Sequence, residues 1–319
     1  TDLDLSTLPN LEFIGGFAFE NSQMTSLDFS KTPKLTYIGH SAFDKNNKLT
    51  DINFSESSAL TYIGQLAFNR AQLTSLDLSG ATSLTYIGWA GFSGSPLLSL
   101  KLPASLQYIG DSAFYKNQLT HLDLSTATSL RYIGEMAFSL YNANTSLRSI
   151  NFGNNCALTF IGDHSFSGGQ LTNLDLSGCA NLTYIGRYAF SRAPLQTLNL
   201  DNPALVYIGR EAFKNAQLSS LDLTKLPNLT IIGRDSFRSS IFNYLDFTNN
   251  NALQFIGERA FYSAPMSDVD LSNSPNLRFV GNQAFKSSTL DEVWISPDAN
   301  FATSSIATKN TDLYTGLYN

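Results

Sequence analysis

The chain has 319 residues, a formal net charge of −6, and 43% hydrophobic residues. The acidic balance disfavours a protein that tracks the phosphates of nucleic acid, and no run reaches the roughly 18 apolar residues needed to cross a bilayer. We therefore expect no nucleic-acid partner and no membrane insertion.

One sequence unit, L-x-x-L-D-L-S-x(5)-L-T-Y-I-G-x-x-A-F-x(4), recurs through almost the whole chain. A Phe always stands four residues after its Gly. The glycines are Gly15, Gly39, Gly64, Gly88, Gly110, Gly134, Gly162, Gly186, Gly209, Gly233, Gly257 and Gly281. This period is typical of leucine-rich repeats. We predict an α/β-type repeat solenoid: a curved, right-handed leucine-rich repeat with a parallel concave β-sheet and about 12 coils of about 24 residues.

Each coil is expected to begin with a strand over L-x-x-L-x-L, as in Leu73–Leu78. The last two leucines then point inward and the residue between them points outward. The segment Leu84–Gly88 returns on the other side with its Leu and Ile inward, and its Gly permits a tight bend or a close approach. The Phe of each unit fills the core, which predicts a column of stacked phenylalanines.

Two parts of the chain depart from the unit. The turn within Ser139–Ser146 holds four extra residues, which predicts a bulge at one edge that is either a neutral loop or a binding edge. The repeat ends after Ile295. We expect residues 1–295 to form the solenoid and residues 296–319 to be a C-terminal cap or a linker to a further domain.

The two cysteines, Cys156 and Cys179, lie 23 residues apart and therefore on adjacent coils. A disulfide is conceivable if their Cα atoms come within about 7 Å. The favoured interpretation is two free thiols.

Aspartates dominate the outward third position of the predicted strand. That position is held by Asp4, Asp28, Asn53, Asp77, Lys101, Asp123, Asn151, Asp175, Asn199, Asp222, Asp246, Asp270 and Trp294. Carboxylates stacked about 4.8 Å apart repel one another by about 0.9 kcal/mol per pair in water. Three explanations remain open: hydrogen bonds to neighbouring Ser, Thr or backbone groups, a face for a basic or hydroxyl-rich partner, and calcium held between aspartates.

Aromatic and acidic residues gather on the last three strands. We predict a ligand-binding cluster of Tyr244, Asp246, Asp268, Asp270, Asp291, Glu292 and Trp294. Aromatic side chains beside carboxylates suit a sugar or a peptide that carries Lys or Arg. The alternative is that Trp294 packs under the tail as part of the cap.

A second, mixed cluster lies on the middle coils. It consists of Lys101, His121, Asp123 and Arg148, and we include it as a weaker ligand-binding candidate.

The return side carries an aromatic residue just before the Ile in eleven of twelve units, as at Tyr86. The rings either shield and pack the coils or offer a stacking surface for glycans. The residue after the Gly is acidic at Asp111, Glu135 and Asp163 and then basic at Arg187, Arg210 and Arg234. That pattern is either solvated charge or a surface that steers a partner.

The composition of the repeat argues against catalysis. The histidines His40, His121 and His164 lie on well-separated coils and cannot converge with Ser and Asp in one site. The chain has no CxxC, HExxH or GxxxxGK[ST] motif. We expect a protein that is not an enzyme, with no cofactor and no resident metal.

The alternation of L-x-x-L-x-L with L-x-x-I-G-x-x-A-F resembles the BspA-like leucine-rich-repeat family of cell-surface proteins. Leu100–Gly110, which reads L-K-L-P-A-S-L-Q-Y-I-G, matches the form L-x-L-P-x-x-L-x-x-I-G. Units shaped like Asn117–Ser125 are similar to versions in Gram-positive lactic-acid bacteria. The resemblance implies display on a bacterial cell surface and binding to host proteins, mucins or other microbes.

We therefore expect a monomeric, non-enzymatic, adhesin-type binding module that engages a host or microbial surface protein or glycan through its concave face. Its location is expected to be extracellular, on the bacterial surface, with signal and anchor outside this sequence. One alternative is a structural stalk that presents another domain. Another is a protist or host-like receptor fragment, which the sequons at Asn144, Asn181 and Asn228 allow.

Overall fold

The computed structural model describes residues 3–139 and 147–286, and the backbone of residues 292–295. Its chain divides into two compact units. Unit 1 comprises Thr1–Leu158 with Ser165–Gly169, and unit 2 comprises Thr159–His164 with Gln170–Asn319. The insertion within Ser139–Ser146 lies outside the described residues except for Ser139, and the tail 296–319 lies outside them entirely.

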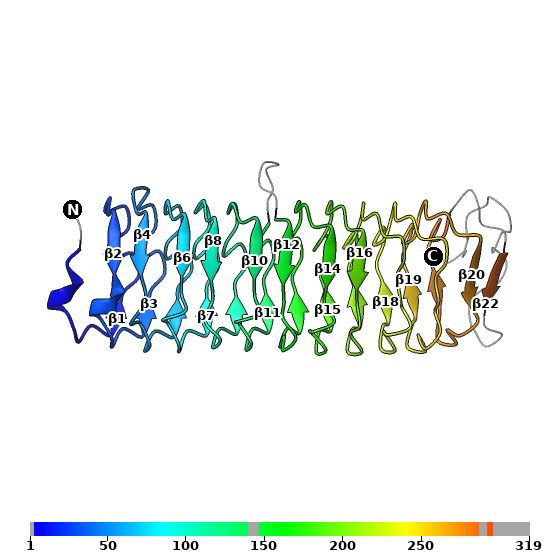
Figure 1. Cartoon of the computed structure of the whole chain (residues 1–319), viewed down its shortest axis with the longest axis horizontal. Coiled ribbons are helices and arrows are strands. Elements are labelled where there is room, and N and C mark those ends of the chain that lie inside the picture. Colours follow the sequence, from blue (N-terminus) through cyan, green and yellow to red (C-terminus); the bar gives the residue numbers. More distant parts are fainter. Residues whose placement is uncertain (1–2, 140–146, 287–291, 296–319) are drawn as a thin grey trace. The chain divides into compact units, whose positions relative to one another are not determined.

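Unit 1 contains two series of parallel strands (Figure 1). The two-residue return strands are β1 (Phe13–Ile14), β3 (Tyr37–Ile38), β5 (Tyr62–Ile63), β7 (Tyr86–Ile87), β9 (Tyr108–Ile109) and β11 (Tyr132–Ile133). The three-residue strands are β2 (Ser26–Asp28), β4 (Asp51–Asn53), β6 (Ser75–Asp77), β8 (Ser99–Lys101), β10 (His121–Asp123) and β12 (Ser149–Asn151). Two short 3₁₀ helices, η1 (Leu5–Thr7) and η2 (Phe29–Lys31), lie near the start of the chain.

Unit 2 repeats this arrangement. Its return strands are β13 (Phe160–Ile161), β15 (Tyr184–Ile185), β17 (Tyr207–Ile208), β18 (Ile231–Ile232), β19 (Phe255–Ile256) and β21 (Phe279–Val280). Its other strands are β14 (Asn173–Asp175), β16 (Thr197–Asn199), β20 (Asp268–Leu271) and β22 (Glu292–Ile295). Parallel bridges from Asp222 to Asp246 and from Asp246 to Asp270 continue the pattern between β16 and β20.

The predicted leucine-rich-repeat solenoid is confirmed, and it contains almost no helix. Both helices in the described ranges are 3₁₀ helices, so the return side is made of short strands and turns where an α/β repeat would place an α-helix. In the same ranges, no helix has the length and apolar character needed to span a membrane.

The core follows the sequence pattern as predicted. Leu76 of β6 is 2% exposed, whereas Ser75 and Asp77 on either side of it are exposed. On the return side Leu84 and Ile87 are fully buried. These alternations place the inward residues of both strands against each other, in the interior of the coil.

The phenylalanines form stacked columns within each unit. Phe43 and Phe68 in unit 1 stack with ring centroids 5.2 Å apart, and Phe213 and Phe237 in unit 2 with centroids 5.3 Å apart. Both pairs are fully buried. The predicted column is therefore present in each unit, where the rings pack one coil against the next.

The repeat glycine is required because consecutive coils approach each other backbone to backbone. A Cβ on Gly64 would lie 2.6 Å from the carbonyl carbon of Gly39, and a Cβ on Gly209 would lie 2.5 Å from that of Gly186. Real Cβ atoms do not come this close to a backbone atom. The prediction that this Gly permits a close approach is confirmed.

The turns after the glycine use a backbone conformation that the sequence pattern does not reveal. Ser41 and Lys45 have positive φ, 50° and 61°, although neither is Gly. The amides of Ser41, Phe43 and Lys45 all donate to carbonyls of the next coil, at 2.8, 2.8 and 3.1 Å. Left-handed backbone costs about 1–3 kcal/mol per residue, and these hydrogen bonds help to offset that cost.

The two cysteines are both disulfide-bonded, and the described residues include no free cysteine. The interpretation of Cys156 and Cys179 as free thiols is therefore wrong. Their 23-residue spacing, which places them on adjacent coils, is compatible with a bond.

We predict that Gly64→Ala destabilises the chain by about 1–3 kcal/mol, as overpacking does, because its Cβ would collide with the backbone of the preceding coil. The matched control is Gly15→Ala in the first coil, where nothing lies within 4 Å of an added Cβ. Thermal and urea unfolding of the two variants measures the difference. Equal midpoints for both variants would contradict the close-approach argument.

Candidate functional site

The candidate site is the strand face, which we define as the outward first and third residues of the three-residue strands and of β20. It also includes the equivalent positions at Asp4, Asp222 and Asp246. In β6, β8, β10 and β14 both outward residues are exposed while the residue between them is buried. Because the inward residues are needed for the core, chemical variation from coil to coil is confined to these outward positions and the adjoining turns.

The aspartates on this face close the turn that follows each strand. In Asp77, Oδ1 accepts a hydrogen bond from the Ser79 amide at 3.0 Å and another from its hydroxyl at 2.5 Å. The same bond to the amide two residues on is made by Asp4, Asp28, Asp123, Asp175, Asp222, Asp246 and Asp270. The explanation through hydrogen bonds to neighbouring Ser, Thr or backbone groups is confirmed for these residues.

Repulsion between the carboxylates is reduced by alternation with other residue types. The amide of Asn53 donates to Asp28 at 2.9 Å, and that of Asn151 donates to Asp123 at 3.0 Å. Lys101 forms an ion pair with Asp77 at 2.8 Å. Three coils of the row therefore receive a donor where a uniform row would place another anion.

The ion pair also sets the protonation of Asp77. Its partial burial alone would raise the pKa of the carboxyl group, but the hydrogen bonds from Lys101 and Ser79 outweigh burial and lower that pKa. The carboxylate is therefore held in its charged form, and its second oxygen is directed to Lys101.

The predicted cluster at the end of the chain is partly described. Tyr244 is 60% exposed, and Asp246, Asp268 and Asp270 are half-buried. The bridge between Asp246 and Asp270 places Tyr244 beside Asp268, two residues earlier on each strand. The backbones of Glu292 and Trp294 in β22 pair with those of Asp268 and Asp270. The side chains of Glu292 and Trp294, and the whole of Asp291, lie outside the described residues.

The predicted middle cluster is spread over β8, β10 and the approach to β12. Lys101 binds Asp77, and Asp123 binds Asn151, so neither is directed to the other. His121 shares a 2.9 Å hydrogen bond with the Thr120 hydroxyl. Arg148 is exposed, and its amide bonds to the Thr120 carbonyl at 2.7 Å. The four residues share one face, but their contacts are made to Asp77, Asn151 and Thr120 and not to one another.

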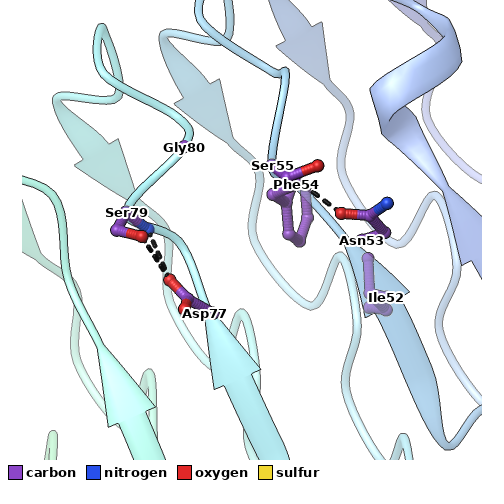
Figure 2. Close-up of a pocket in the computed structure, with 7 residues that line it drawn as sticks. All are labelled: Ile52, Asn53, Phe54, Ser55, Asp77, Ser79 and Gly80. Carbon is purple, nitrogen blue, oxygen red and sulfur yellow. Dashed lines mark hydrogen bonds between the residues drawn. The ribbon is translucent and has the colours of Figure 1, made fainter.

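A hollow of about 310 Å³ opens on the strand face between β4 and β6. Figure 2 shows Asp77 and Ser79 on one side of it and Asn53, Phe54 and Ser55 on the other. Gly80 lines the hollow where the two coils approach closely: a Cβ there would lie 2.4 Å from the Ser55 carbonyl oxygen. Sequence reasoning missed this hollow. The signal was Gly80, since the coils on either side carry Glu56 and Ala104 at that position, although Gly178 holds the same position in the coil of Asp175.

The aromatic row on the return strands stacks ring upon ring. Tyr62 and Tyr86 have centroids 4.8 Å apart and an interplanar angle of 2°, and Tyr184 and Tyr207 have 4.6 Å and 6°. Sugars stack on ring faces, and within the row those faces cover one another. The geometry therefore favours packing and argues against the glycan-stacking alternative, because the row presents ring edges and hydroxyl groups to solvent.

Each histidine has a different local partner. His40 packs edge-on against Phe17 with centroids 4.9 Å apart, and His164 stacks on Tyr188 at 4.5 Å. Together with the bond of His121 to Thr120, these contacts place the three rings in three separate environments. Among the residues that the structure describes, no group of three or more His, Cys, Asp or Glu side chains is placed to hold a metal ion.

Residues 2–88, 61–196 and 183–314 match the profile of the BspA type leucine rich repeat region. None of the curated proteins compared with the chain matches it. A leucine-rich repeat protein from Bacteroides ovatus is similar in structure, with a TM-score of 0.59, 21% identity, and coverage of 91% of this chain and 78% of that one.

Two further structures match less closely. The functional domain of InlJ from Listeria monocytogenes has a TM-score of 0.47 and 22% identity, covering 92% of this chain and 61% of that one. The pneumococcal vaccine antigen PcpA has a TM-score of 0.38 and 16% identity, covering 75% of this chain and 72% of that one.

We predict that Asp175→Ala destabilises the chain by about 1–2 kcal/mol while Asp175→Asn is close to neutral. Asp175 accepts from the Ser177 amide at 2.9 Å and from its hydroxyl at 2.7 Å, and an Asn oxygen can accept both bonds, as Asn53 does from the Ser55 amide. Urea unfolding compares the two variants. A cost that is the same for Asn and Ala would mean that charge, and not turn closure, is what the row provides.

We predict that the fold loses stability as the pH rises from about 10 to about 12. Burial, with a contribution from Tyr132, raises the pKa of Tyr108 to about 12, whereas a tyrosine of the unfolded chain ionises near pH 10. The folded state therefore holds this proton more tightly, and its contribution is complete below pH 10 and lost above it. Tyrosinate absorbance, recorded with circular dichroism, tests this. Ionisation of all tyrosines near pH 10 in the intact fold would refute it, and Tyr108→Phe should remove part of the late-ionising signal.

Proposed function

The chain belongs to the BspA type leucine-rich-repeat family, and from that premise we propose that it is a non-enzymatic, adhesin-type binding module. In this proposal it acts as a monomer on the outside of a bacterial cell. Its strand face engages a host or microbial surface protein or glycan.

The observation that carries the proposal is the contrast, within each coil, between buried residues that repeat and exposed residues that vary. The inward residues repeat almost unchanged and are buried, whereas the strand face bears exposed hydroxyl, amide, carboxylate and basic groups that differ between coils. A protein or glycan partner is recognised by such a mixture of donors and acceptors around a few aromatic anchors. Tyr244, 60% exposed, supplies one anchor.

The hollow beside β6 supports the same proposal. Its volume of about 310 Å³ falls at the lower end of the range for small-molecule sites. Its polar lining of Asn53, Ser55, Asp77 and Ser79 suits a hydroxyl-rich group such as a sugar at the end of a chain. Lys101, bound to Asp77, adds a charged donor next to the hollow.

The disulfide-bonded cysteines agree with the proposed location. Disulfides persist in oxidising surroundings such as the outside of a cell and are rare in the cytosol. A bonded pair in a chain with only two cysteines therefore favours an extracellular site of action.

The test is a glycan and extracellular-matrix array probed with the folded chain, with and without EDTA. We expect a saturable hit that Tyr244→Ala or Lys101→Ala weakens about tenfold, the usual effect of removing a contact that contributes about 1.4 kcal/mol. The matched control is Trp89→Ala, which removes an aromatic side chain that is 47% exposed on the return side.

Two results would count against the proposal. A hit that Trp89→Ala abolishes and the strand-face variants leave intact would move the site to the return side. A blank array with folded protein would favour the stalk, which needs no ligand.

Loss of a hit in EDTA would support the calcium explanation of the aspartate row.

A further inference from the structure

A band of basic side chains lies on the turns that follow the return strands of unit 2, away from the strand face. We call it the basic band, and it consists of Arg187, Arg210, Lys214, Arg234, Arg238 and Arg259. Arg187, Arg210 and Arg234 occupy the same position on successive coils, directly after the repeat glycine. The amides of Tyr188 and Glu211 donate to the carbonyls of Arg210 and Arg234, at 2.8 Å each, so these coils stack in register.

Buried carboxylates hold the basic groups from below. Asp235 is 1% exposed and contacts three guanidinium groups, those of Arg234 at 3.2 Å, Arg238 at 3.3 Å and Arg259 at 3.1 Å. Glu211, 8% exposed, contacts Arg210 at 3.1 Å and Lys214 at 2.8 Å. The equivalent positions in unit 1 hold uncharged residues such as Ser112 and Met136. A carboxylate buried under several cations fixes the positions of those cations. Each guanidinium has five N–H donors and uses only some of them to bind the carboxylate, so the others are left to bind a ligand.

The aromatic side chains add a second restraint. The guanidinium of Arg210 lies over the ring of Tyr188, 5.7 Å from its centroid, and that of Arg238 lies over Tyr262 at 5.0 Å. Tyr188 also donates its hydroxyl to Glu211 at 3.0 Å. These contacts order side chains that would otherwise lose rotamer entropy on binding a ligand, which lowers the cost of binding.

Cations outnumber anions in the band. Its six basic groups face Asp163, Glu211, Asp235 and Glu258, of which Glu211 and Asp235 are buried. Arg187 is exposed, and it bonds through its side chain to Tyr207 while its amide is bound by Asp163. The outer surface is therefore positive in a chain whose net charge is −6.

We propose that the basic band binds an acidic polysaccharide, through oxyanion groups that accept hydrogen bonds from Arg187, Arg210 and Arg234. Guanidinium groups bind carboxylate, sulfate and phosphate through paired donors. Arginines repeated once per coil, about 4.8 Å apart, suit a linear polymer that runs along the stacked turns. Double-stranded DNA carries one charge per roughly 1.7 Å, so the acidic remainder of the chain repels it more strongly than it repels a polysaccharide of lower charge density. This surface is independent of the proposed strand-face site.

The test measures retention of the folded chain on immobilised dextran sulfate and polygalacturonic acid, with neutral dextran and oligothymidylate as comparison ligands. We expect salt-sensitive binding to an acidic polysaccharide and none to dextran. Arg187→Gln with Arg210→Gln should weaken that binding about tenfold or more, through the loss of charge-assisted hydrogen bonds. The matched control, Arg70→Gln with Lys116→Gln, removes the same charge from exposed positions on the turns of unit 1.

The single variant Arg187→Gln separates loss of binding from loss of folding. Arg187 contacts neither buried carboxylate, so its substitution should leave the fold intact. This variant should still weaken binding several-fold. A purely structural role of the band predicts altered unfolding without altered retention. The proposal is overturned if neither acidic polysaccharide binds at low salt, if the control pair weakens binding as much as the band variants, or if oligothymidylate binds as tightly as the polysaccharides.

Discussion

Every other feature of the molecule depends on the close approach of one coil's backbone to the next at the repeat glycine. At Gly64 and at Gly209 there is no room for a Cβ, because the preceding coil occupies that space. This contact sets the spacing at which the return strands pair, the phenylalanines stack and the turn amides reach the next coil's carbonyls. A repeat that cannot vary its spacing must carry its variation in the outward side chains.

Because the coils stack at a fixed spacing, the side chains at each outward position form a row. Like side chains in such a row contact one another, and these contacts change their properties. Tyrosines in a row cover one another's faces, so they act as packing groups and do not offer their faces to sugars. Burial in the row raises the pKa values of Tyr62, Tyr86, Tyr108 and Tyr184. Aspartates in a row would repel one another, and this repulsion is reduced because Asn53, Lys101 and Asn151 each donate a hydrogen bond to a neighbouring aspartate. The turn-closing hydrogen bond explains why Asp or Asn, each with an acceptor oxygen, holds this position in all coils except those of Lys101 and Trp294.

The two proposed surfaces use the same scaffold in different ways. On the strand face of unit 1, a hollow between two coils has a polar lining that is already ordered by turn hydrogen bonds. On the turns of unit 2, carboxylates placed beneath the surface order the arginines above them. In both places the groups that would meet a ligand are positioned by neighbours within the fold, which lowers the entropy lost on binding. A binding module with a polar face and a basic band is consistent with a family of repeats that vary only on the outside.

The sequence by itself determined the repeat, its inward Leu, Ile and Phe positions, the need for Gly at the close approach and the outward row of Asp, because each of these recurs about every 24 residues. It also placed Lys101, His121, Asp123 and Arg148 in one cluster on the middle coils, and Tyr244 and Asp268 in another on the last three strands. Only the tertiary structure decided what those groups bind: Lys101 pairs with Asp77, the cysteines are bonded, and Asp235 is buried beneath three arginines. The positive φ at Ser41 and the hollow at Gly80 were equally hidden. Periodicity reveals which residues face inward, whereas a contact between two outward side chains depends on rotamers and on the exact spacing of neighbouring coils, which no single unit of sequence contains.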